Sequence, residues 1–325
     1  MLKRFFALII VLALFAVCFF GCGERREDRI DIVCTVFPIY DWVRNIIGED
    51  NEDIALHLLV KNGTDPHSYT PSPSDVAKIL SCDTLIYVGG ESDLWVADVL
   101  EGVINEDMRE IKLLELLGER AFLEENENCF EEDCHDHDHH HDHGHEGAYD
   151  EHIWLSLKNA SFLCGEIAEA LSDQFSICAD IYLENAEKYI NRVEELDRKF
   201  EGVVSSSLRK TLLFADRFPF GYMAEDYGIE CFAAFSGCSA DSEASFETVT
   251  GLAKKIDEME LSCVVILENS TTALADTVIS NSKSDEVRIV VMDSLQSITE
   301  TQIKNGVSYL SVMEKNLDAV KTALN

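Results

Sequence analysis

The chain has 325 residues, 46% of them hydrophobic, which is long enough for two domains of ordinary size. Its 26 Lys and Arg residues stand against 61 Asp and Glu residues, giving a formal charge of −35 at pH 7. Nucleic acids and anionic lipid surfaces are bound through clustered cations, so this charge excludes them as partners and favours small cations.

The N-terminal segment has the pattern of an export signal. A basic start and an apolar run over 5–20 are typical of a signal peptide, with a spanning helix as the alternative. The run ends in "FFGC", which resembles the lipobox of bacterial lipoproteins. This resemblance implies a signal peptide over 1–21, cleavage before Cys22 and a lipid on the Cys22 thiol. We therefore predict a protein on the extracytoplasmic face of the bacterial cell membrane, anchored by lipid through a flexible leader at 22–30.

Strands and helices then alternate along the first half of the chain. Apolar, β-branched runs over 29–40, 54–60 and 83–90 predict strands, and the segments 41–48 and 73–80 predict helices between them. This β-α-β-α-β order predicts a parallel sheet, in which the loops that leave the carboxyl ends of strands carry function.

One such loop, "GTDPHSYTPSPSD" at 63–75, contains a single histidine, His67, among three prolines. Proline fixes φ and removes backbone donors, so this segment cannot continue a helix or a central strand. A histidine held in such a loop loses little freedom on binding, and neutral imidazole is a common zinc ligand. The alternative is a surface histidine in a turn.

A low-complexity, acidic and histidine-rich segment follows, "CFEEDCHDHDHHHDHGHEGAYDEH" at 129–152. It is too polar to pack, and we predict a surface loop over 134–146. Imidazole-rich tracts suit zinc, copper and nickel better than manganese or calcium, so the loop is predicted to collect metal ions; an insertion without a role is the alternative. Its candidate ligands are His135, His137, His139, His140, His141, His143 and His145.

The second half repeats the pattern of the first after one long amphipathic helix predicted over 182–200. Strands are predicted at 210–216, 229–235, 262–268 and 288–293, and helices at 220–228, 245–259, 272–281 and from about Val307. The fold class predicted is therefore α/β, with two parallel-sheet lobes joined by a long helix. The boundaries we expect are 31–175 for the N-terminal lobe, 176–204 for the linking helix and 205–325 for the C-terminal lobe.

At seven places the sequence resembles the substrate-binding receptors of bacterial zinc and manganese ABC importers. The stretches are "VCTVFPIYDWV", "LLVKNGTDPHSYTPSPSDVAKI", "LIYVGGESDLWV", "DEHIWLSLKNA", "YLENAEKYI", "VVILENSTTALADTV" and "VVMDSLQSI". They follow the family's order and cover nearly all of the chain after Arg29, and "DPHSYTPSPSD" is the most specific. The resemblance implies two α/β lobes, a metal held in the cleft between them, and delivery of that metal by a monomeric receptor to an ABC permease.

The resemblance also implies a set of metal ligands. His67 and His152, in "DEHIWL", match the family's first two ligands, and Asp293, at the end of the strand predicted over 288–293, matches its carboxylate ligand. The alternative for His152 and for Asp293 is a capping role at the start of the following segment.

The third ligand is where the sequence departs from the family. Zinc receptors usually carry a histidine after the first strand of the second lobe, and Arg217 stands at that position. Arginine is permanently protonated and cannot bind a cation, so we predict that the neighbouring Asp216 is the ligand. Cys238, Glu243 and a water molecule are the alternatives.

The metal and the function follow from these assignments. The histidine-rich loop favours zinc, whereas two carboxylates in the cleft favour manganese, and we predict zinc with manganese as the alternative. Neither a HExxH metalloprotease motif nor a GxSxG nucleophile motif occurs. We therefore predict a receptor for zinc import and no enzyme; a manganese receptor, a surface adhesin and a zinc hydrolase are the alternative functions.

Overall fold

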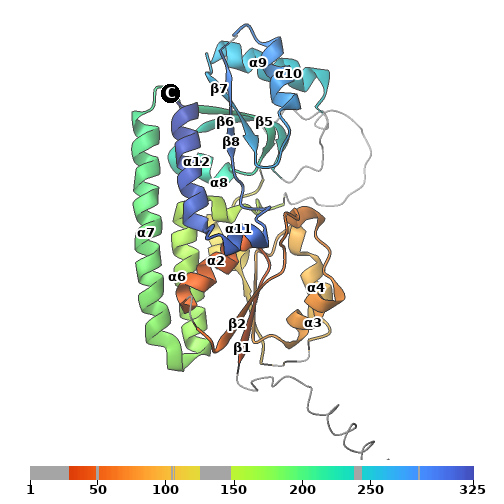
Figure 1. Cartoon of the computed structure of the whole chain (residues 1–325), viewed down its shortest axis with the longest axis vertical. Coiled ribbons are helices and arrows are strands. Elements are labelled where there is room, and N and C mark those ends of the chain that lie inside the picture. Colours follow the sequence, from red (N-terminus) through yellow and green to blue (C-terminus); the bar gives the residue numbers. More distant parts are fainter. Residues whose placement is uncertain are drawn as a thin grey trace, which may run out of the picture.

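The computed structural model describes residues 29–48, 51–103, 105, 107–124, 148–237, 244–284 and 286–325. Within these ranges the chain forms two four-stranded parallel sheets, one in each lobe (Figure 1). None of the described helices is both long and apolar enough to cross a membrane. The predicted signal segment, Cys22 and the histidine-rich loop lie outside the described residues.

The N-terminal lobe has the strand order β2-β1-β3-β4. Helices α3 and α4 cover one face of this sheet, where Val33 and Leu85 are buried, and α2 and α6 cover the other. The bounds are β1 Ile30–Cys34, α2 Phe37–Ile47, β2 Ile54–Leu58, α3 Pro73–Ser81, β3 Thr84–Tyr87, α4 Trp95–Leu100, β4 Arg109–Lys112, α5 Leu113–Leu117 and α6 Leu157–Gln174.

The C-terminal lobe has the equivalent order β6-β5-β7-β8. Alternate residues of β5 face opposite sides: Leu213 packs against α9 and α10, whereas Phe214 belongs to the core shared with α8 and α12. The bounds are β5 Thr211–Phe218, α8 Gly221–Tyr227, β6 Glu230–Ser236, α9 Phe246–Glu258, β7 Cys263–Leu267, α10 Ala273–Asn281, β8 Arg288–Met292, α11 Glu300–Lys304 and α12 Tyr309–Ala323.

The predicted fold class is confirmed, and the differences are shifted element ends and one strand that was not predicted. The first strand stops at Cys34 rather than running to Tyr40, because Pro38 lies in the first turn of α2. The backbone N–H groups of a first helical turn have no partner within the helix, so a proline, which has no N–H, is tolerated there. Strand β4 was not predicted, since Arg109, Glu110 and Lys112 make it a polar edge strand without an apolar run.

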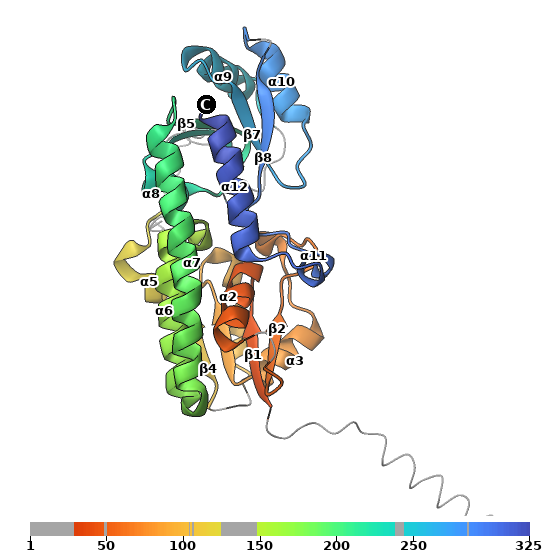
Figure 2. The ribbon, with the colours of Figure 1, turned by 60° about the vertical axis from the view of Figure 1, so that its left-hand side comes forward.

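Two helices join the lobes: α7, Ala179–Ser206, runs alongside both, and α12 runs along the C-terminal lobe and meets α2 at its first residues (Figure 2). The first has 28 residues and buries one apolar stripe. Its Tyr189 hydroxyl donates to Asp41 of α2, and its Asp197 accepts a hydrogen bond from Tyr227 of α8. The second is α12, whose Tyr309 backbone N–H also donates to Asp41. The largest apolar core therefore runs through both lobes as one continuous cluster.

Candidate metal centre

His67 lies in a short turn that is fixed by hydrogen bonds within the loop. The turn, a 3-10 helix at Pro66–Ser68, begins at Asp65, whose Oδ1 accepts from the His67 backbone N–H at 3.0 Å. A few residues later Ser72 and Asp75 cap the start of α3 reciprocally. The proline-rich segment is therefore an ordered connection, and it presents His67 where the loop leaves the carboxyl end of β2.

His152 is the most enclosed of the predicted ligands. Its side chain is fully buried, and Asp150 Oδ1 accepts from both the His152 backbone N–H and Nδ1, each at 2.8 Å. This arrangement places the ring proton on Nδ1 and leaves a lone pair on Nε2. Nε2 is buried, and among the described residues it has no hydrogen-bond partner. A buried polar atom without a partner is costly, and a bound cation would satisfy it.

The two imidazoles are adjacent, with ring centroids 5.5 Å apart and ring planes inclined by 54°. Burial and the neighbouring His152 lower the pKa of His67, so that its ring is neutral near pH 7. Burial alone would lower the pKa of His152, but the Asp150 carboxylate outweighs burial and raises it. The pair therefore offers a cation the neutral ring of His67 and the Nε2 of His152, whose ring is oriented by Asp150.

Asp216, the predicted third ligand, lies at a bulge in β5, where the register with β6 shifts between Phe214 and Arg217. Both carboxylate oxygens of Asp216 accept backbone N–H groups, Oδ1 from Arg217 at 2.9 Å and Oδ2 from Leu267 at 3.0 Å. The Arg217 guanidinium instead crosses to the N-terminal lobe and donates to Asp65 Oδ2 at 2.9 Å. The other candidates, Cys238 and Glu243, lie outside the described residues.

Asp293 follows β8 directly, and its charge acts on the carboxyl group of Glu268, which the sequence did not single out. Asp293 Oδ1 accepts from the Leu295 backbone N–H at 2.8 Å, and Glu268, directly after β7, accepts from both the backbone N–H and the hydroxyl of Ser294. Burial and the charge of Asp293 raise the pKa of Glu268 to about 7. The position of Glu268 at the carboxyl end of a buried strand was the available signal, because β7 and β8 end at the same edge of the sheet.

The segment that follows Asp293 contacts the N-terminal lobe beside the histidine pair. Gln296 Nε2 lies 3.4 Å from His67 Nε2, and the Trp154 indole donates to the Ser294 carbonyl at 2.9 Å. In the described ranges, however, no three His, Cys, Asp or Glu side chains lie close enough to hold a metal as they stand. A cation bound by the two imidazoles would have to draw carboxylates of the C-terminal lobe toward it or take ligands from the segment 238–243.

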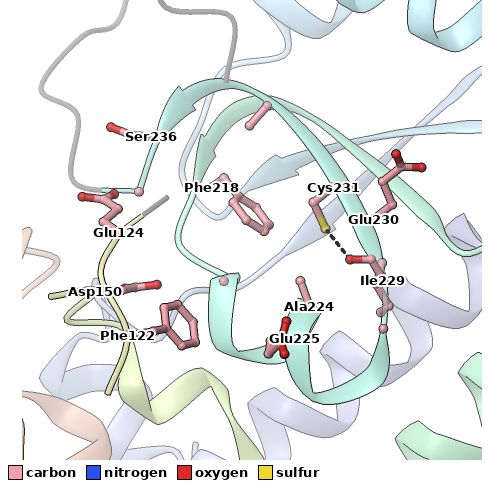
Figure 3. A pocket seen from close by; sticks show the side chains of 14 residues that line it. Phe122, Glu124, Asp150, Phe218, Ala224, Glu225, Ile229, Glu230, Cys231 and Ser236 are labelled. Carbon is pink, nitrogen blue, oxygen red and sulfur yellow. Dashed lines mark hydrogen bonds between the residues drawn. The ribbon is translucent and has the colours of Figure 1, made fainter. Parts of the chain in front are cut away.

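An acidic cavity of about 510 Å³ adjoins His152 on the side of the C-terminal lobe. Figure 3 shows Glu124 and Asp150 of the N-terminal lobe on one side of it, facing Phe218, Glu225 and other residues of β5, α8 and β6. Asp150 thus has two roles, because it lines the cavity and also holds the His152 ring. The negative charge along this wall favours the approach of a cation.

Comparison with known proteins places this geometry in a family. The family model described as the periplasmic component A of the zinc-uptake complex matches residues 32–323. The chain belongs to this family. The family predicted from the sequence is therefore confirmed, and it is a family of zinc-uptake components rather than of enzymes.

The sequences of individual relatives align with nearly the whole of this chain. The zinc-binding lipoprotein AdcA of Streptococcus pneumoniae is 31% identical over 315 residues, which are 96% of this chain and 60% of AdcA. The high-affinity zinc uptake system protein ZnuA of Bacillus subtilis is 25% identical over 308 residues, 94% of this chain and 90% of ZnuA. The chain thus spans about 60% of the length of the streptococcal relative.

Solved structures show the same fold. The crystal structure of the Zn(II)-bound ZnuA-like domain of S. pneumoniae AdcA is 29% identical, with a TM-score of 0.70 over 91% of this chain and 99% of that domain. The structure of the lipoprotein YcdH of B. subtilis, at 22% identity and a TM-score of 0.73, supports the fold alone.

Proposed function

We propose that this protein is an extracytoplasmic receptor that captures zinc between its two lobes and delivers it to an ABC permease. The observation that carries the proposal is the buried Nε2 of His152, which has no partner in the described part of the chain and belongs to a ring 5.5 Å from that of His67. Family membership and the zinc-binding names of the relatives support the same function.

The donor set fits zinc. Zinc in proteins is bound by about four imidazole, thiolate or carboxylate ligands. We propose His67, His152 and Asp293 as three of them, with the fourth from Asp216, as the sequence predicts, or from Glu268, whose carboxyl group lies beside Asp293. Imidazole and the position of zinc in the Irving–Williams order favour zinc over manganese at such a site.

The remaining predictions extend this proposal beyond the described residues. We propose that the histidines of 134–146 collect zinc near the cleft without forming the tight site. A lipid on Cys22 would keep the receptor at the membrane that contains its permease, and the lipoprotein name of the pneumococcal relative supports such an anchor. The proposed role requires no catalysis and a single copy of the chain.

The decisive experiment is zinc binding by His67→Ala and His152→Ala, measured by competition with a chromophoric chelator so that only tightly held zinc is counted. Loss of an outer partner of a metal ligand costs about 10- to 100-fold in affinity, and loss of the ligand itself should cost more. Each variant should therefore bind zinc at least about 100-fold more weakly than the parent, with an unchanged circular dichroism spectrum.

His57→Ala is the matched control. His57 lies in β2 of the same lobe, and its Nε2 pairs with Asp31 rather than with His67 or His152. This variant should bind zinc like the parent. Parental affinity in both the His67 and the His152 variants would contradict the proposed site, whatever the histidine-rich loop binds.

A further inference from the structure

The ion pair between Arg217 and Asp65 joins the two lobes beside the histidine pair. Arg217 Nη1 lies 2.9 Å from Asp65 Oδ2, across 152 positions of sequence. The side chains are 25% and 31% exposed, so the contact is half-buried and better protected from water than an ordinary surface ion pair. Arg217 is fixed in turn by the bulge in β5, so it projects from the sheet of the C-terminal lobe rather than from a free loop.

The two oxygens of Asp65 serve different partners. Oδ2 receives the guanidinium of the C-terminal lobe, whereas Oδ1 accepts from the His67 backbone N–H at 3.0 Å. The Asp65 carbonyl also accepts from the Ser68 backbone N–H at 3.1 Å. One rigid carboxylate therefore connects β5 to the turn that carries His67, and a change in the position of Arg217 is transmitted to this turn.

We propose that Arg217 is a positioning residue for metal capture: through Asp65 it holds the His67 turn against the C-terminal lobe before any metal arrives. The inference rests on the proposed zinc-receptor function, because the purpose of the held turn is to present His67 next to His152. Preorganisation of this kind raises affinity, because the cost of ordering the ligand has already been met when the ion binds. We therefore predict that the metal-free receptor keeps its lobes in contact at this corner without help from the ion.

The test begins with the metal-free protein. Arg217→Met removes the charge and keeps a long side chain, and hydrogen exchange measured by NMR reports on the His67 amide, which donates to Asp65. In the variant this amide should exchange at least about tenfold faster than in the parent, since its acceptor is no longer held from the other lobe. Arg217→Lys keeps one cationic contact and should restore part of the protection.

The matched control is Lys61→Met. Lys61 and Glu300 also form an ion pair between the two halves of the chain, at 2.8 Å, with 36% and 42% exposure, but both residues lie outside the turn at Pro66–Ser68. Lys61→Met should leave the exchange of the His67 amide unchanged. Equal acceleration by both variants would overturn the proposal, because it would mean that any contact between the halves protects the turn.

Zinc affinity and a double-mutant cycle complete the test. Arg217→Met should weaken zinc binding by about 10- to 100-fold, the range found for outer partners of metal ligands. Asp65→Asn leaves one oxygen for two donors and should do the same, and the double variant should be no weaker than the worse single variant. Additive losses, or parental exchange and affinity in Arg217→Met, would refute the positioning role. A parent protein without tight zinc would refute the zinc function instead, while the metal-free exchange would still test the contact.

Discussion

Asp93 is a buried carboxyl group whose charge should destabilise the fold of the N-terminal lobe. It is 6% exposed, and its Oδ2 accepts from the backbone N–H groups of Val88 and Gly89 at 2.9 and 3.1 Å. Burial, together with the charge of Glu151, raises its pKa from 3.8 to about 6. Between these values the folded protein binds more protons than the unfolded chain, so the free energy of unfolding falls as pH rises from 3.8 to 6 and is constant above.

The size of the effect follows from the shift. Two pKa units correspond to about 3 kcal/mol of stability that the parent loses on deprotonation. Asp93→Asn stays neutral, and its single amide oxygen can accept both backbone N–H groups, because both donate to one oxygen in the parent. At pH 7.5 the metal-free variant should therefore be more stable by up to about 3 kcal/mol, and below pH 4 the difference should vanish.

Urea denaturation of the metal-free parent and variant from pH 3 to pH 8 measures this difference. Asp98→Asn, which removes an exposed charge from the nearby helix α4, is the control and should show no comparable pH dependence. An Asp93→Asn variant that is less stable than the parent at pH 7.5 would refute the reasoning, as would a gain that persists unchanged below pH 4.

Three further predictions concern the metal. Asp150→Asn should lower zinc affinity about 10- to 100-fold in chelator competition, because a neutral amide oxygen holds the His152 ring more weakly than a carboxylate does; parental affinity would show that packing alone orients it. Deleting residues 134–146 should reduce the number of zinc ions seen by native mass spectrometry and leave one tight ion, whereas loss of that ion would mean that the loop supplies a ligand. Asp216→Ala should weaken zinc binding by orders of magnitude. If Glu268→Ala weakens binding to this extent and Asp216→Ala does not, Glu268 is the fourth ligand.

The repeated elements of the fold could be read from the sequence, because buried strands and amphipathic helices have distinct hydrophobic periods. The second strand, predicted over 54–60, is β2 at Ile54–Leu58, and the helix predicted over 182–200 lies within α7. A polar edge strand such as β4 has no such period, and its pairing depends on a neighbour distant in sequence.

The site was predictable only in part. His67 is marked by its prolines and Asp293 by the strand before it, but the contact of Arg217 with Asp65 joins residues 152 positions apart and leaves no local trace. The bulge between Phe214 and Arg217 breaks the regular alternation of side chains along β5, and a bulge of this kind has no single sequence signature.

The pairing of α7 with α12 has a mechanical consequence. At 1.5 Å per residue, the 28 residues of α7 form a rod about 42 Å long, and both helices are fixed to the N-terminal lobe through Asp41. Bending such a rod would break backbone hydrogen bonds and the apolar seam along it, so its stiffness opposes the wide swing that extended hinge strands allow. Exchange of the ion should then proceed by short displacements of the segments around His67 and Asp293. Under the proposed function, release of the bound ion would then depend on a partner protein that binds those segments from outside, and not on elastic strain stored within the receptor.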